Sequence, residues 1–110
     1  SGLGVIAEGS AEGKGTFGVD VDQSIDHPDT IISSALANQG QSCYDTIRDA
    51  ATGKWTYGTI YYGADDGVPI VAINLNYPGG IPADALKAAK DAQAALASGA
   101  IKAPETTTTK

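Results

Sequence analysis

The sequence predicts an α/β fold, in which short buried strands alternate with helices. Segments with helical spacing alternate with short runs rich in β-branched residues, and brief polar or glycine-rich turns separate them. The composition agrees, because 42% of the 110 residues are hydrophobic and 18% are charged, as is usual in globular proteins. A chain of this length forms one small domain with a modest core.

The first half of the chain predicts one helix and two strands. Residues 1–15 favour a helix that ends at one of its late glycines, and residues 16–21 form a short apolar strand. Residues 24–29 are a loop, because Pro28 biases the residue before it away from helical geometry. The continuous β-branched run over residues 30–36 indicates a buried strand or an extended crossover.

The second half predicts two helices around two further strands. Helical spacing runs over residues 38–51, and residues 56–63 are rich in the Thr, Tyr and Ile that favour strands. Residues 68–76 predict a second apolar strand, with Pro69 near its start, where a missing donor is tolerated. The clearest helix covers residues 82–98.

Bulk properties restrict the function. The formal charge of −6 repels phosphate backbones, so nucleic acid is not an expected partner. No apolar run approaches the length of a membrane span. The single cysteine, Cys43, excludes a disulfide framework within the chain. Residues 1–104 form the domain, and the polar, low-complexity residues 105–110 predict a disordered tail.

The run DVDQS places Asp20 and Asp22 where the first strand ends. Phosphotransferases of the haloacid-dehalogenase type use a similar pair, in which one carboxylate attacks phosphorus, the other acts as acid or base, and magnesium offsets the charge. Asp65 and Asp66 would supply further metal ligands. Ser24 does not have the hydroxyl spacing of that motif, and the chain is short for that fold. This reading remains one alternative.

The other use of such a carboxylate is to bind a ligand. In open α/β sheets, ligands bind beyond the carboxyl ends of the strands. Asp20 there would accept two hydrogen bonds from neighbouring hydroxyls of a sugar, while Asp22 and Gln23 would help to fix the loop. Gly2 and Gly4 would expose backbone N–H groups at a helix start to a polar group of the ligand.

The chain also resembles a known family over nearly its whole length, up to about Pro104. Its glycine-rich start, its first helix and the run GVDVDQ resemble the basic membrane lipoprotein family, the purine-nucleoside-receptor type of solute-binding protein in ABC transporters. The run DTIISSALANQGQSCYDTIRDAATGKW resembles the hinge strand and helix of that family. YGTIYYGADDGVPIVAINLN resembles the next pair of strands, and the ending SGAIKAP resembles the end of the final helix.

The resemblance implies a type I periplasmic-binding-protein fold, with parallel sheets flanked by helices and two lobes joined by hinge strands. This chain matches its C-terminal portion, with segments from both lobes. The implied function is reversible capture of a nucleoside-like ligand for an ABC importer permease, outside the cytoplasm, with no catalysis, metal or cofactor. The implied lipid anchor lies in an N-terminal part that is missing here. The family expects a Lys where this chain has Ala37, and the amide of Asn38 is the candidate to replace it.

The two-lobe interpretation has a consequence for stability. The chain would cross between lobes near residues 30–35 and again near residues 67–73, so each lobe holds too few elements to cover its strands. We expect five side chains to be partly uncovered: Ile31, Ile32, Ile60, Val71 and Ile73. The partner would be the missing N-terminal part or a second copy. A structural or assembly domain that binds no ligand is the third alternative.

Overall fold

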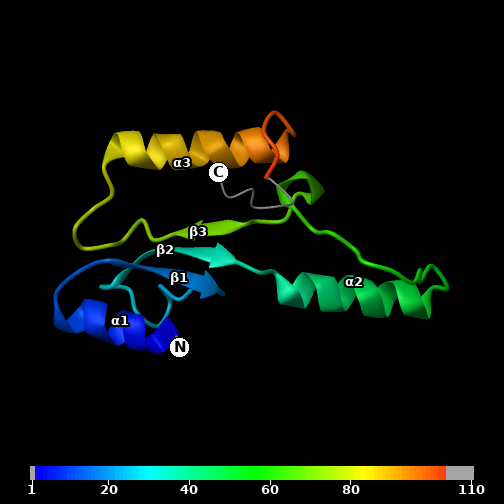
Figure 1. Ribbon diagram of the computed structural model, residues 1–110, viewed down its shortest axis with the longest axis horizontal. Helices are drawn as coiled ribbons and strands as arrows, with labels where there is room; N and C mark the ends of the chain where they lie inside the picture. Colours follow the sequence, from blue (N-terminus) through cyan, green and yellow to red (C-terminus); the bar gives the residue numbers. More distant parts are fainter. Residues whose placement is uncertain (1, 104–110) are drawn as a thin grey trace, which may run out of the picture.

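The computed structural model describes residues 2–103 and is an α/β structure (Figure 1). The predicted tail at residues 105–110 lies outside the described residues. The helices and strands agree with most of the predicted elements. In chain order they are α1 (Gly2–Ala11), β1 (Thr16–Asp20), β2 (Ile31–Leu36), α2 (Gln39–Ala51), the short 3-10 helix η1 (Ala64–Asp66), β3 (Val71–Ile73) and α3 (Ala83–Ala97).

The three strands form one sheet in the order β1-β2-β3. β1 and β2 run parallel, with Asp20 opposite Leu36, whereas β2 and β3 run antiparallel, with Ser33 opposite Ile73. The α/β prediction is confirmed, but the sheet is mixed rather than wholly parallel. The chain leaves the sheet at the C-terminal end of β2 and returns to the same end of the sheet after η1. β3 therefore runs in the direction opposite to β2.

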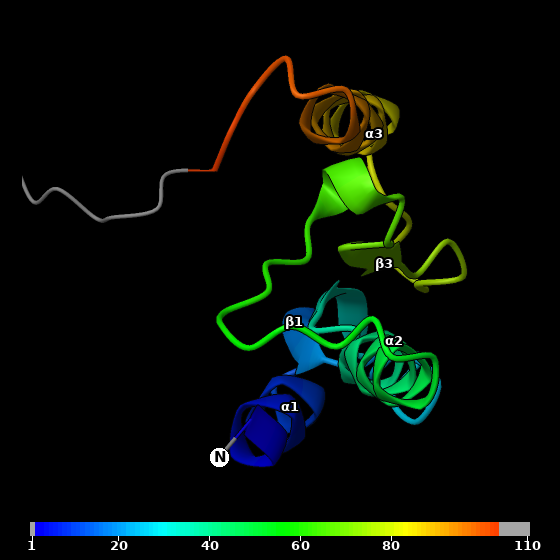
Figure 2. The same ribbon diagram turned by 90° about the vertical axis from the view of Figure 1, so that its right-hand side faces the viewer.

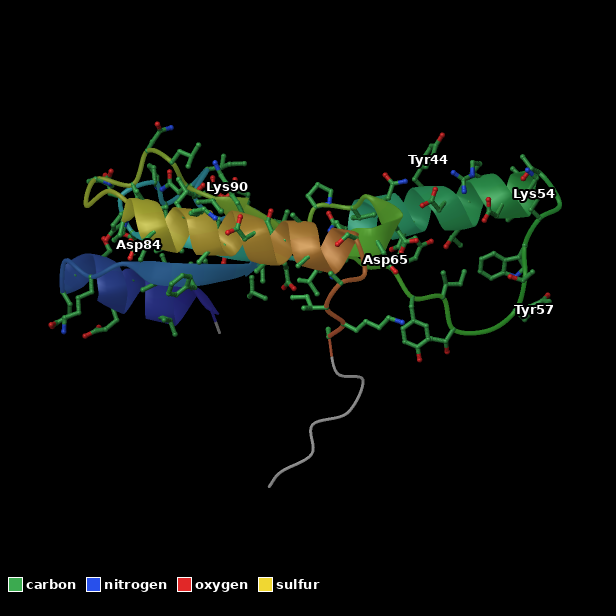
Figure 3. All side chains as sticks on the ribbon, turned by 90° about the horizontal axis from the view of Figure 1, so that it is seen from above. Tyr44, Lys54, Tyr57, Asp65, Asp84 and Lys90 are labelled. Carbon is green, nitrogen blue, oxygen red and sulfur yellow. The ribbon has the colours of Figure 1, made fainter. Side chains whose placement is uncertain are left out.

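The helices lie at different places around this sheet. α1 packs along β1, and α3 lies beyond β3, where it contacts η1 (Figures 1 and 2). α2 leads away from the end of β2, so it and the segment after it extend from the sheet (Figure 1). Figure 3 shows Lys54 and Tyr57 at the far end of this extension, well separated from Asp84 and Lys90 on α3.

The core is small. Among the described residues, the buried large apolar side chains are Ile6, 2% exposed, and Ile31, 0% exposed. The expectation that Ile31 is partly uncovered is therefore wrong, because it lies in β2, which has a neighbouring strand on each side. Ile60 is 48% exposed, as expected, and the other members of that group are half-buried: Ile32, Val71 and Ile73.

The predicted strand over residues 56–63 is absent. The described chain is extended there but pairs with no neighbour, and Gly58 has a φ of 139°. A strand exists only through its hydrogen-bonded partner, and Thr/Tyr/Ile composition does not provide one. Its large side chains consequently remain exposed, with Tyr57 at 94% and Tyr61 at 84%.

α2 is likewise uncovered, and local pairs support it. Its largest aliphatic side chain, Ile47, is open to solvent and 68% exposed. Arg48 forms an ion pair with Asp45 at 2.7 Å and a hydrogen bond with Asp49 at 3.0 Å, and the bond to Asp49 is the main cause of a raised pKa for the guanidinium. Figure 3 labels Tyr44 on this helix and Lys54 just beyond its C-terminal end.

Candidate functional site

The candidate site lies at the C-terminal end of β1 and β2. We call this end of the sheet, where both strands finish, the edge, as distinct from its outer strand. Asp20 and Leu36 are register partners there, and the N–H of Ala37 donates to the carbonyl of Asp20 at 3.0 Å. Asp20 has a φ of 74° and Asn38 a φ of 50°, so two of the predicted site residues occupy the left-handed region. Asp and Asn tolerate this region better than most residues, but it still costs free energy. The side chain of Asp20 is exposed at this edge.

The loop after Asp20 is closed by its own side chains. The Oδ1 atom of Asp22 accepts hydrogen bonds from the N–H of Ser24 at 3.1 Å and from its hydroxyl at 2.6 Å. This is an Asx-type turn, in which a short side chain replaces a backbone partner. The carboxylate of Asp22 is thus engaged in the loop, whereas that of Asp20 faces outward.

Gln23 attaches the same loop to the sheet. Its Oε1 atom accepts from the N–H of Val19 at 2.9 Å, and its N–H donates to the hydroxyl of Ser34 at 3.1 Å. Ser34 is 0% exposed. Gly18 makes this arrangement possible, because a Cβ at that position would lie 2.4 Å from Ser34 Oγ and 2.8 Å from Gln23 Oε1.

Asn38 joins the two points at which the chain crosses this edge. It is the N-cap residue of α2, but its side chain makes no capping bond. Its Nδ2 group instead donates to the carbonyl of Pro69, just before β3. A cavity of about 520 Å³ opens beside this contact, lined by the first turns of α2 and by the segment around η1. Asn38 lines the cavity with Asp45 and Tyr62.

The start of α1 lies near the same end of the sheet. α1 begins at Gly2, below the arrowhead of β1 (Figure 1), and Gly4 lines the groove between α1 and the start of β1. A Cβ on either glycine would meet nothing within 4 Å, which indicates open space around them. The first-turn N–H groups of a helix have no partner within the helix and carry partial positive charge.

The structure thus places Asp20 and Asn38 at this end of the sheet, with Gly2 at the helix start below β1, whereas Gly4 lines a groove with Gly15 and Thr16 at the start of β1. The fifth predicted residue, Asp22, lies in the adjoining loop and is bonded to Ser24. Sequence reasoning missed the carbonyl of Pro69 and the hydroxyl of Ser34. Nothing local indicates that Pro69 is a partner of Asn38, 31 residues away. The β-branched context of Ser34 does indicate burial, and a buried hydroxyl requires a partner.

The aspartate pairs do not assemble a metal centre in the described part of the chain. No group of three or more His, Cys, Asp or Glu side chains over residues 2–103 is arranged to hold a metal ion. Asp65 and Asp66 lie on η1, where Asp66 accepts from the N–H of Gly63 at 2.9 Å. No helix in this range is long and apolar enough to cross a membrane.

These features define an α/β protein with polar groups gathered where its strands end, the place at which open α/β sheets bind ligands. The model of the Bmp family matches residues 1–102 of the 110-residue chain. This family is described as "ABC transporter substrate-binding protein PnrA-like". The chain therefore belongs to the Bmp family, and the predicted membership is confirmed. A comparison with curated proteins found no match.

Family membership establishes the general role. Bmp proteins have a periplasmic-binding-protein fold and serve ABC transporters as extracytoplasmic substrate-binding proteins, which are non-enzymatic in general. A small-molecule ligand and an ABC permease are the partners that the family implies. The comparisons give no support to the phosphotransferase alternative.

Proposed function

We propose that the chain supplies part of an interlobe site for a nucleoside or a related small polar ligand, which a solute-binding protein delivers to an ABC permease. The observation that carries this proposal is the exposed carboxylate of Asp20 at the carboxyl end of β1. A carboxylate with two free oxygens accepts hydrogen bonds from both hydroxyls of a vicinal diol. Asp22 is less available for this purpose because Ser24 occupies its Oδ1 atom.

The remaining edge groups complete the polar surroundings. The helix start at Gly2 supports a hydrogen-bond acceptor on the ligand, because helical N–H groups carry partial positive charge. The carbonyl of Asn38 accepts from Gln41 and Ser42 in the first turn of α2, and its amide is bonded to Pro69. A ligand that engages the amide must therefore compete with that bond. Capture by hydrogen bonds is reversible and requires no metal or cofactor.

The proposal includes a second lobe. β2 leads out of the sheet at Asn38 and the chain returns at Pro69, so the sheet and the extension formed by residues 39–66 meet at a narrow connection. In a two-lobed binding protein such crossings are the hinge, and the ligand is enclosed as the lobes close. The side chains of Ile47, Tyr57 and Tyr61 are exposed on that extension. Their exposure supports the proposal that another part of the protein covers it.

We assign this cover to an N-terminal part of the protein that also bears the lipid anchor, with a second copy of the chain as the alternative. Residues 1–104 then belong to the C-terminal portion of the binding protein, with segments in both lobes. Anchoring would hold the protein outside the cytoplasm, beside its permease. A large exposed apolar surface is usual where a further element or chain binds.

Calorimetric titration with adenosine, inosine, guanosine and uridine tests the ligand proposal, using the protein with whatever flanking sequence it naturally carries. We expect saturable binding of at least one nucleoside and a loss of about tenfold or more for Asp20→Ala, since hydrogen bonds to charged groups contribute about 1.5–3 kcal/mol. Asp29→Ala is the control, because Asp29 lies exposed at the opposite end of the sheet, just before β2.

Two results would count against the proposal. If no nucleoside binds, the alternative of a structural or assembly domain that binds no ligand is favoured over the proposed function. If a nucleoside binds equally well to the wild-type protein and to Asp20→Ala, the ligand lies elsewhere.

A further inference from the structure

The side chain of Gln23 bonds to the lateral side of β1 that faces away from β2. β1 is the outer strand of the sheet, with β2 on its other side. The N–H of Val19 donates to Gln23 Oε1 at 2.9 Å, and the carbonyl of Val19 accepts from the N–H of Val21 at 3.0 Å. Both backbone groups of Val19 are therefore satisfied by the loop that follows the strand. An edge strand otherwise presents these groups unpaired.

This arrangement holds Asp20 from both sides. Val19 is fixed through Gln23 and Val21, while the carbonyl of Asp20 itself accepts from Ala37 at 3.0 Å. Asp20 lies between these contacts with a φ of 74°. A non-glycine residue keeps such a backbone only where its surroundings over-determine it. The direction of its carboxylate therefore depends on those contacts.

Gln23 is itself well anchored. Its N–H donates to Ser34 Oγ, and Ser34 is fully buried in the central strand. The side chain lies close over Gly18, where a Cβ would come within 2.8 Å of its Oε1 atom. Backbone and side chain together therefore connect the loop to both β1 and β2, which makes Gln23 a rigid support rather than a surface amide.

We propose that Gln23 is a positioning residue for the ligand site: its Oε1 atom, by capping the N–H of Val19, holds the strand end so that the carboxylate of Asp20 points to the ligand. This inference rests on the proposed function. Gln23 acts through Asp20 and needs no contact with the ligand. The requirement is an acceptor oxygen at this place, which a glutamate also supplies and a methionine does not.

The test compares Gln23→Met with Gln23→Glu in the protein with its natural flanking sequence, titrated with the nucleoside that binds best. Gln23→Met should weaken binding about tenfold, as expected for a lost hydrogen bond that fixes a charged partner. Gln23→Glu should stay within about threefold of wild type, since it keeps the acceptor. The control is Gln93→Met, which makes the same substitution on α3, outside the candidate site.

A double-mutant cycle distinguishes positioning from a general structural role. In an Asp20→Ala background, Gln23→Met should change affinity by less than about twofold, because the group through which it acts is gone. An equal loss in both backgrounds would overturn the inference, as would wild-type affinity for Gln23→Met. If Gln23→Met does not fold, Gln23→Asn replaces it with the same expected loss, because its side chain is one methylene shorter.

The two proposals fail in different ways. Unchanged affinity for Asp20→Ala overturns the proposed function, and the role of Gln23 falls with it. Weakened affinity for Asp20→Ala, together with wild-type affinity for Gln23→Met, overturns the positioning role alone.

Discussion

Replacing Gly18 by alanine should destabilise the sheet, although the change adds only one methyl group. The new Cβ would lie 2.4 Å from Ser34 Oγ, 2.8 Å from Gln23 Oε1 and 3.1 Å from Gln23 Cβ. Gly18 is buried and Ser34 is fully buried, so neither side can move freely. The new methyl group would press on both Ser34 Oγ and the side chain of Gln23, so we expect the hydrogen bond from the Gln23 N–H to Ser34 Oγ to be lost.

The expected change in the free energy of unfolding combines two destabilising effects and one stabilising effect. Overpacking costs about 1–3 kcal/mol. Loss of the Gln23–Ser34 hydrogen bond adds about 1 kcal/mol. The lower entropy of an unfolded alanine offsets about 0.4–1 kcal/mol, since Gly18 does not have a positive φ. The net expectation is a destabilisation of about 2 kcal/mol.

Urea denaturation followed by circular dichroism measures this change, with Gly40→Ala as the matched control. A Cβ at Gly40 would meet nothing within 4 Å, and this glycine lies in α2. Alanine there should stabilise the protein, by up to about 1 kcal/mol. The two substitutions are chemically identical and should shift the transition in opposite directions. Unchanged stability for Gly18→Ala, to within about 0.5 kcal/mol, would refute the packing described around Gln23.

Three further outcomes are expected. Asn74→Ala should destabilise the protein by about 2–4 kcal/mol in urea, because Asn74 is 7% exposed and donates to the carbonyls of Pro28 and Ile31. Asn76→Ala, at an exposed position, should change stability by no more than about 0.5 kcal/mol. Equal urea midpoints for the two variants would contradict this. Asn38→Gly should destabilise less than Asn38→Ala by thermal melting, since glycine relieves the left-handed backbone; the reverse order would show that φ does not matter there. Acrylamide should quench Trp55, 40% exposed, in this chain alone and less when the proposed N-terminal part is present; equal quenching would argue against that cover.

The elements that the sequence predicts correctly are those with local causes. Helical spacing with glycine at its end is sufficient to define α2, whose predicted range of 38–51 is observed as Gln39–Ala51. The range 82–98 likewise agrees with α3, observed as Ala83–Ala97. Proline and glycine boundaries act within a few residues of the place where they stand, so no tertiary information is needed.

The failures have non-local causes. Residues 56–63 have strand composition but find no partner within the described chain, so composition alone misleads. The direction of β3 depends on where the chain re-enters the sheet, and no residue in β3 encodes that. Burial of Ile31 depends on its central position, which the strand order decides.

The candidate site shows the same division. The pattern of an apolar strand followed by Asp20 correctly predicts a carboxylate at a strand end. The contact between Asn38 and the carbonyl of Pro69 could not be predicted, because it joins two crossings that the sequence separates by 31 residues. The positive φ of Asp20 is also invisible in the sequence, since Asp adopts ordinary backbone geometry in most places.

Hydrogen exchange with and without a saturating nucleoside tests most directly whether ligand binds at the edge where β1 and β2 end. The protein is measured with its natural flanking sequence, at a nucleoside concentration fixed by titration. The account predicts slower exchange over residues 19–24 and 36–39, with no change over residues 13–15 and 77–80 at the opposite end of the sheet. Protection confined to residues 13–15 and 77–80, or none at either end despite measured binding, would contradict it.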